Sequence, residues 1–245
     1  MPTPEDFLSC ESSSSEEEEH EGEEDYEEEV EYVEVNKRFY PSNVAILQDT
    51  ANDELIKFNP EKQVSFLGAR LEATGPIVPA GDIIVIRLAT GFLKDRLLAR
   101  SAWALYFGPQ SQFNTYRGYD GISRDVPSET ENLLEVIEYV EDIQRFVDDI
   151  NMFIIATDDA SLVELATEEL RIMARDEDFR ERGSGQPREY YELWSAIDRQ
   201  AHGYRHDEGP QYRFWLIPEE MNQEARTLMD CKLNPDDHEE EDLWV

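Results

Sequence analysis

The clearest hydrophobic pattern in the chain is the run at residues 152–156, which leads through a threonine into two acidic residues. The run is too short for a helix, is β-branched at Ile154 and Ile155, and is bounded by turn-forming and charged residues. These features predict a buried central strand. Ligand chemistry collects at the carboxyl ends of strands in open sheets. Asp158, directly after this strand, is therefore the first candidate functional residue.

The remaining hydrophobic patterns predict both strands and helices around this run. Further strands are expected at 82–89, 99–107, 113–118 and 212–217, and helices at about 128–147, 160–174, 188–201 and 221–232. Ser128 and Glu131 form a capping-box signature at the start of the first helix. Short gaps between the first three strands indicate an antiparallel meander. The order βββ–α–β–α–α–β–α predicts an α/β fold whose mixed five-stranded sheet has three antiparallel strands, then parallel strands, with flanking helices.

Composition divides the chain into four segments. Residues 1–36 form an acidic tail that we expect to be disordered, and residues 37–81 an irregular leader with short strands or a helical turn. Residues 82–232 hold the folded domain, and residues 233–245 form a second acidic tail. The chain has neither a secretory signal pattern nor an apolar run near the roughly 20 residues that span a bilayer. We therefore expect an intracellular protein, nuclear or cytoplasmic, with no membrane partner.

The net charge of −35 weakens a nucleic-acid function without excluding a local basic patch. Residues 1–36 hold 16 of the 57 acids and no Lys or Arg, so residues 37–245 keep 41 acids against 22 bases, a balance of −19. The serines at 12–15 precede four glutamates and resemble acid-directed kinase sites. The tail is interpreted first as solubilising; the alternatives are a phosphorylated arm or a lure for basic proteins. Cys10 and Cys231 lack metal-site spacing and are interpreted as reduced thiols.

Four segments, taken in order, resemble a type 1 ribonuclease H domain, in particular the divergent version common in fungi. They are the helix 131–136 with Glu135, the strand and following residues 154–160 with Asp158, the loop and helix pieces 185–187 and 192–194, and the strand and turn 214–222 with Ala225 after them. The resemblance covers about residues 82–232. It implies a ribonuclease H-like fold that binds nucleic acid and hydrolyses RNA in RNA–DNA hybrids.

The resemblance also implies two-metal chemistry with Mg²⁺, in which four acids hold two ions about 4 Å apart. Glu135 and Asp158 match the second and third of these acids. The first falls on Arg87 with its two following residues, and the fourth on Arg226. Two metal ligands are thus replaced by cations, which would repel a metal. We expect Arg87 and Arg226 to pair with the two remaining acids, and hydrolysis to be lost or strongly impaired.

A different register could restore the acid set. Asp82 lies at the wrong end of its strand and Asp95 is expected in the following loop, so neither is a comparable substitute for the first ligand. Glu224 or Asp230 could serve as the fourth. Three functions stay open: an active hybrid nuclease, a catalytically dead nucleic-acid binder, and an acidic module that binds basic proteins through residues 11–34.

Two other groups have competing interpretations. The arginines of the region that resembles the family's basic protrusion are interleaved with acids, so a solvated mixed-charge surface is favoured over a hybrid contact; they are Arg175, Arg180, Arg182 and Arg188. Trp103, Trp194 and Trp215 lie in apolar patterns and are interpreted as core residues rather than base-stacking platforms.

Overall fold

The computed structural model describes residues 37–44, 47, 50–70, 76–95, 98–122, 126–147, 149–174, 188–197 and 211–233. All of them belong to one compact unit, Glu34–Val245. Three predicted features lie outside the described residues: the acidic tail 1–36 with its serines at 12–15, the charged loop around 175–187, and the tail from residue 234.

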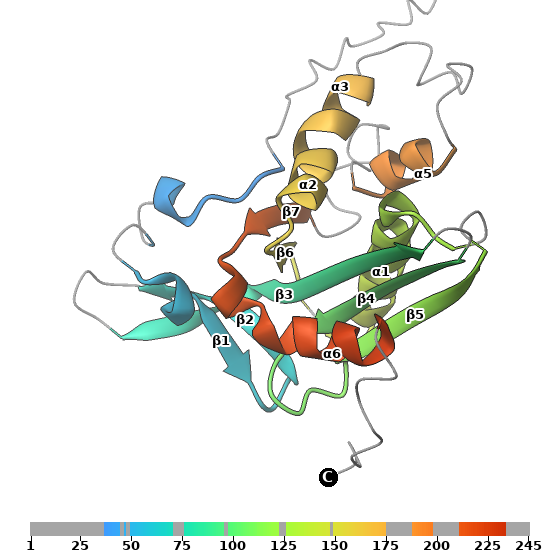
Figure 1. Cartoon of the computed structure of the whole chain (residues 1–245). Helices are drawn as coiled ribbons and strands as arrows, with labels where there is room; N and C mark the ends of the chain where they lie inside the picture. Colours follow the sequence, from blue (N-terminus) through green and yellow to red (C-terminus); the bar gives the residue numbers. More distant parts are fainter. Residues whose placement is uncertain are drawn as a thin grey trace, which may run out of the picture. The chain divides into compact units, whose positions relative to one another are not determined.

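The five predicted strands all belong to one sheet (Figure 1). They are β3 (Ile77–Asp95), β4 (Leu98–Tyr106), β5 (Thr115–Ile122), β6 (Met152–Thr157) and β7 (Gln211–Leu216). β3, β4 and β5 pair antiparallel, β6 pairs parallel with β3, and β7 pairs parallel with β6. The predicted mixed sheet, with antiparallel strands first and parallel strands after them, is therefore confirmed.

Among the described residues, the sheet has seven strands rather than five. The two additional strands, β1 (Ile56–Asn59) and β2 (Val64–Arg70), form an antiparallel hairpin within the segment expected as an irregular leader. β2 pairs with the first half of β3, which is 19 residues long and begins before the predicted boundary at residue 82. Pro79 and Gly81 obscured this half of β3 in the sequence, because both residue types are uncommon inside strands.

The helices follow the predicted pattern closely. α1 (Glu129–Gln144) begins with the predicted capping box, in which the Ser128 side chain accepts from the Glu131 backbone and the Glu131 side chain accepts from the Ser128 backbone. The predicted helix over 160–174 consists of α2 (Ala160–Glu164), a π-helical turn (Leu165–Glu169) and α3 (Leu170–Ala174). α5 (Arg188–Ile197) and α6 (Gln223–Leu233) complete the set. Short 3₁₀ turns lie at Pro41–Asn43, Asn52–Glu54 and Glu219–Met221.

Side-chain alternation along β3 separates two packing layers. Ile84, Ile86 and Leu88 belong to a core shared with α1, the helical stretch 160–174 and α5. The alternate positions face a smaller apolar group near β1 and β2 and, further along, α6. The three tryptophans predicted as core, Trp103, Trp194 and Trp215, are all buried. In the described part of the chain, no helix has the length and apolar character needed to cross a membrane.

Candidate functional site

Asp158 lies at the carboxyl end of β6, as predicted, and its carboxylate is bonded on both oxygens. Asn222 Nδ2 donates to Asp158 Oδ1 at 2.6 Å, and Arg226 donates to Oδ2 through both Nε and Nη2. The Asp158 side chain is only 7% exposed, so this cation and this amide replace water around a nearly buried charge. The hydrogen bond to Asp158 is the main reason that the pKa of Arg226 is raised.

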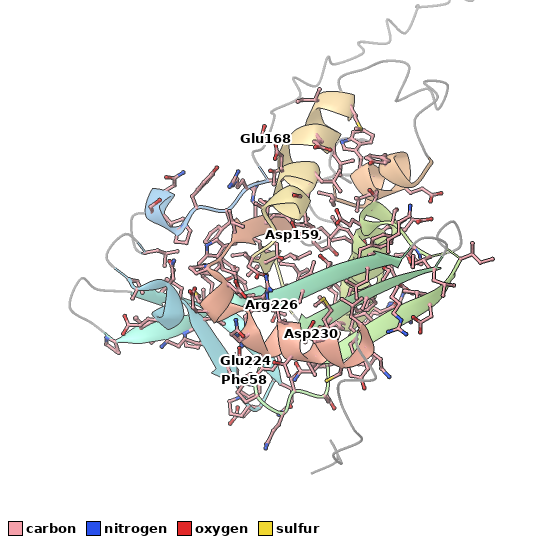
Figure 2. All side chains as sticks on the ribbon, in the orientation of Figure 1. Phe58, Asp159, Glu168, Glu224, Arg226 and Asp230 are labelled. Atoms are coloured by element: carbon pink, nitrogen blue, oxygen red, sulfur yellow. The ribbon has the colours of Figure 1, made fainter. Side chains whose placement is uncertain are left out.

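Local structure explains why these three side chains meet. The 3₁₀ turn after β7 ends at Asn222, whose backbone carbonyl accepts from the Arg226 amide and so begins α6. The Asn222 side chain is fully buried and also donates to the Leu88 carbonyl of β3 at 2.9 Å. Asn222 thereby fixes the start of α6 against β3 and β6. Figure 2 shows Arg226 on this helix with Glu224 nearby.

Arg87 forms a second ion pair beside the first. Its Nη1 donates to Glu224 Oε2 and to the Met221 carbonyl, both at 2.7 Å, and its guanidinium lies 4.5 Å from the centre of the Tyr106 ring. Arg226 was expected to pair with one of the two acids that match the family, and its pairing with Asp158 confirms this. Arg87 was expected to pair with such an acid too, but that prediction is wrong, because Arg87 pairs with Glu224. Strand alternation is the reason: Arg87 shares a face with its neighbours two residues away, and that face carries α6 rather than α1.

Glu135 lies on α1, as predicted, but its carboxylate is tied to β4 and β5. Trp103 Nε1 donates to Glu135 Oε2 at 2.7 Å, Tyr119 OH donates to the same oxygen at 2.5 Å, and Arg117 forms an ion pair with Oε1. Burial is the main reason that the pKa of Tyr119 is raised, and the hydrogen bond from Tyr119 to Glu135 is the second reason. Glu135 therefore anchors α1 to the sheet through three donors.

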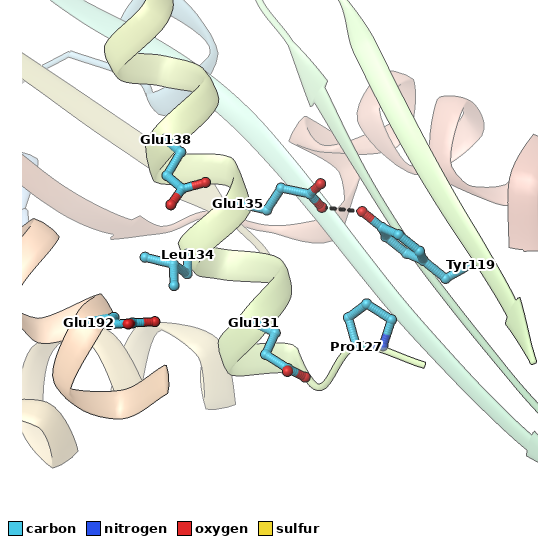
Figure 3. A pocket seen from close by; sticks show the side chains of 7 residues that line it. All are labelled: Tyr119, Pro127, Glu131, Leu134, Glu135, Glu138 and Glu192. Atoms are coloured by element: carbon cyan, nitrogen blue, oxygen red, sulfur yellow. Dashed lines mark hydrogen bonds between the residues drawn. The ribbon is translucent and has the colours of Figure 1, made fainter. Parts of the chain in front are cut away.

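An open pocket of about 460 Å³ lies beside Glu135 (Figure 3). Its lining residues are Tyr119, Pro127, Glu131, Leu134, Glu135, Glu138 and Glu192. The pocket is strongly acidic, but Glu131 is used in the capping box and Glu135 is fully engaged with its three donors.

A third acidic position, Asp159, was not singled out in the sequence. Its Oδ1 accepts from the amides of Ser161 and Leu162 and caps α2, while Thr90 Oγ1 lies 3.4 Å from its Oδ2. The pKa of Glu129 at the start of α1 is raised mainly by burial and secondly by the negative charge of Asp159. An Asp directly before a helical pattern is an N-cap signal, and that signal could have identified the capping role.

The strand register identifies which residue of β3 approaches these acids. Arg87 pairs with Ala156, and continuing that parallel register places Thr90 level with Asp159. The residue of β3 level with Asp159 is therefore a threonine and not an acid. Matching the family's first acid to this position instead of Arg87 does not restore the missing metal ligand. Asp82 accepts from Asn151 before the start of β6, at the opposite end of the strand from Asp158. Asp95 was predicted to lie in the loop after this strand. It is instead the last residue of β3.

The residues present do not fit a pair of Mg²⁺ ions. Both oxygens of Asp158 and both oxygens of Glu135 already accept hydrogen bonds, and each carboxylate has an arginine as partner. The partners of Glu135 come from β4 and β5, whereas those of Asp158 come from the start of α6. Across the described ranges, no three His, Cys, Asp or Glu side chains are grouped closely enough to hold a metal.

Neither a protein-family model nor a curated protein matches the chain. Solved structures do match. The LC11 ribonuclease H1, isolated from compost by a metagenomic approach, is 13% identical over 64% of this chain and 99% of its own, with a TM-score of 0.38. The LC9 ribonuclease H1, a type 1 enzyme with the type 2 active-site motif, is 14% identical over 63% and 73%, with a TM-score of 0.38. The ribonuclease H1 of the archaeon Halobacterium salinarum is 16% identical over 63% and 99%, with a TM-score of 0.31.

These identities bear on the fold alone, and at such TM-scores no functional residue is transferred from them. The stronger observation is the connectivity of the chain itself. Three antiparallel strands lead through α1 into β6, and β6 leads through further helices into the parallel β7 and then α6. The closer resemblance to the fungal version stays a prediction. The connectivity from β3 to α6 is the order of strands and helices that the sequence predicted.

Proposed function

We propose that this chain is a pseudoenzyme: a ribonuclease H-like domain that binds its target and does not hydrolyse RNA–DNA hybrids by two-metal chemistry. The observation that carries the proposal is the contact between Asp158 and Arg226. Asp158 is the acid at the position where the resemblance implies a metal ligand, and a guanidinium occupies the space beside it.

Electrostatics supports this reading. A cation bonded to Asp158 neutralises the charge that would attract Mg²⁺, and a guanidinium cannot lose its proton near neutral pH. A metal would have to displace Arg226 from a nearly buried partner as well as the Asn222 amide. Arg87 compensates Glu224 in the same way, which removes the acid that could have replaced the fourth ligand.

The experiment is cleavage of a labelled RNA–DNA hybrid by the full chain with Mg²⁺ or Mn²⁺, beside an active type 1 ribonuclease H under the same conditions. The proposal predicts no cleavage by this chain. Cleavage that is abolished by Asp158→Asn would contradict it and would show that Asp158 still serves as a ligand. Asp142→Asn is the matched carboxylate control, because Asp142 is a largely exposed acid on α1.

What the domain binds is the second part of the proposal. The resemblance favours the RNA–DNA hybrid, and binding through phosphates would weaken steeply with added salt. A titration of uncleaved hybrid at several salt concentrations measures this slope. Saturable binding with a steep slope supports a nucleic-acid binder, and absence of binding at low salt rules it out.

A second candidate, an acidic module for basic proteins, is favoured by the charge. Even without residues 1–36 the chain has a balance of −19, and long-range attraction between opposite charges speeds association with basic partners. Binding to a histone-like basic protein that disappears when residues 11–34 are replaced by an uncharged Gly/Ser segment would support this candidate. Retained binding would place the contact elsewhere.

A further inference from the structure

The strand β5 forms one edge of the sheet and is open along its outer side. Among the described residues it pairs only with β4, and Figure 1 shows it at the outer margin of the sheet. The outward N–H and C=O groups of an edge strand can pair with the backbone of another chain. Proteins commonly protect such edges with a proline, a lysine or a β-bulge, and β5 has none of these. Five of its eight residues are exposed: Tyr116, Arg117, Gly118, Asp120 and Ile122.

The two charged residues of β5 are already compensated within the chain. Arg117 pairs with Glu135 of α1 on one face of the sheet. Asp120 pairs with Arg100 of β4 on the other face, where Nε of the arginine lies 3.0 Å from Oδ1 of the acid. Neither residue therefore presents a free charge that would repel a second strand at this edge.

The exposed side chains make β5 self-complementary in one antiparallel register. Alternation places Tyr116, Gly118, Asp120 and Ile122 on the face that carries α6. When two copies of β5 pair around Tyr119, Tyr116 of each copy lies opposite Ile122 of the other, and Gly118 lies opposite Asp120. Tyr116 and Ile122 are 41% and 50% exposed, and an aromatic side chain opposite a β-branched one stabilises an antiparallel pair. The register therefore forms this favourable pair twice.

The neighbouring registers are less favourable. A pairing centred on Gly118 places Tyr116 opposite the carboxylate of Asp120. A pairing centred on Asp120 places two carboxylates opposite each other, which destabilises a sheet. A pairing centred between two residues would set the α6 face of one copy beside the α1 face of the other and interrupt both packing layers.

Lys232 of α6 adds charge complementarity to the register centred on Tyr119. A Cβ on Gly118 would lie 3.0 Å from Lys232 Cβ, so Lys232 lies directly over this glycine. Its Nζ lies 5.2 Å from the centre of the Tyr116 ring. Asp120 of a second copy would lie opposite Gly118 and hence beside this ammonium group. The Asp120 side chain is 67% exposed and pairs with Arg100 through Oδ1, so Oδ2 can accept from Lys232 of the other copy.

We infer that two copies of this chain associate through β5, antiparallel and centred on Tyr119, so that their sheets become continuous. Tyr116 of each copy packs on Ile122 of the other, and the backbone groups of both open edges are paired. The contact is a single pair of strands and is small, so the dimer is weak and depends on concentration. This inference goes beyond the proposed function and does not depend on it.

Sedimentation of the full chain over a concentration series tests the association. High salt is used, because it screens the repulsion between two chains of net charge −35. A dimer should appear as the concentration rises, and Ile122→Lys should weaken it by about tenfold through loss of both aromatic pairs. Leu93→Lys is the matched control and should leave the dimer unchanged, since Leu93 is 44% exposed on the same face but belongs to β3. A monomer at every concentration overturns the inference and leaves the edge to a strand of another protein, and equal weakening by both variants also overturns it.

Cross-linking tests the register independently and covers the case in which Ile122→Lys misfolds. Cys10 and Cys231, the chain's 2 cysteines, are first replaced by serine. Chains with Tyr116→Cys are then mixed with chains with Ile122→Cys and oxidised. The mixture should give a cross-linked dimer and each variant alone should not, because the two copies of either position lie six residues apart, about 20 Å. Leu93→Cys mixed with Tyr116→Cys is the control. A mixture without the cross-link, or one that cross-links no better than the control, overturns the inference.

Discussion

The two faces of the sheet hold their helices in different ways. On the face of α1 the contact is made by large apolar side chains, with Glu135 as a polar anchor among them. On the face of α6 it is made by alanines, glycines, a methionine and a leucine, with ion pairs at the start of the helix. β3 contributes to both faces through alternate residues. The two acids that match the family, Glu135 and Asp158, therefore lie in two separate packing layers.

Loss of volume should be most damaging on the face of α1. Leu133 is fully buried in the core beneath this helix. Leu133→Ala should lower the free energy of unfolding by about 3 kcal/mol, because the apolar contact is lost and a cavity remains. Urea denaturation measures the change. Leu134 is a partly buried neighbour that lines the pocket, so Leu134→Ala should lower the free energy of unfolding clearly less. Equal losses for the two variants would contradict the packing of Leu133 in the core beneath α1.

Loss of charge should matter most on the face of α6. Arg226→Met leaves Asp158 as a nearly buried carboxylate without its cation. Removing one partner of a buried pair costs about 3–5 kcal/mol, but Arg226 is 40% exposed, so we expect roughly 2 kcal/mol. Arg145→Met is the control, since Arg145 and its partner Asp142 are both largely exposed.

A second substitution shows whether the cost of Arg226→Met comes from the stranded charge. Asp158→Asn in the Arg226→Met background should recover part of the stability, because a neutral amide needs no counter-ion. Further destabilisation by Asp158→Asn in that background would mean that Asp158 is held by other contacts, with Arg226 contributing little.

Addition of volume gives a smaller effect and tests how closely α6 packs on the sheet. Gly91→Ala places a methyl group 2.7 Å from Leu233 Cδ2 and 2.8 Å from Met229 Sδ. These are the ends of flexible side chains, so we expect a loss of about 1 kcal/mol in the free energy of unfolding. Gly81→Ala on the same strand meets nothing within 4 Å and is the matched control. A stabilised Gly91→Ala would mean that α6 packs less closely than described.

The sequence predicted the order of strands and helices along the chain because each strand has a distinct apolar pattern bounded by turn signals. Asp158 was identified for the same reason, as the acid that follows the most hydrophobic strand. The hairpin of β1 and β2 was missed as part of the sheet, because its register depends on the first half of β3, where Pro79 and Gly81 weaken the strand pattern.

Side-chain partners were harder to predict than elements. Arg87 was placed on the correct strand, but its partner depends on which helix covers that face, and residue spacing alone does not reveal this. The Trp103 and Tyr119 donors to Glu135 come from two different strands that precede α1, 32 and 16 residues away from Glu135 in the sequence. Such contacts follow from the packing of α1 on the sheet, which periodicity predicts only as an apolar stripe.

The smallest predicted effect concerns the carboxylates at the starts of α1 and α2. Glu129 has a pKa raised above its ordinary 4.5 by burial first and by the charge of Asp159 second. Asp159→Asn keeps a capping residue for α2 while removing that charge. The pKa of Glu129, followed by NMR titration, should therefore fall part of the way toward 4.5, since burial remains. Thr90→Val is the control, because it removes the contact with Asp159 but no charge.

The sign of this shift fixes how Glu129 affects stability. Between 4.5 and the raised pKa, the folded chain binds more protons at Glu129 than the unfolded chain does. The contribution of Glu129 to the free energy of unfolding is therefore greatest below pH 4.5 and declines as the pH rises through this window. Asp159→Asn should make that decline shallower, because it narrows the gap between the two pKa values. An unchanged pH profile would mean that burial alone raises the pKa of Glu129 and that the two helix starts are electrostatically independent.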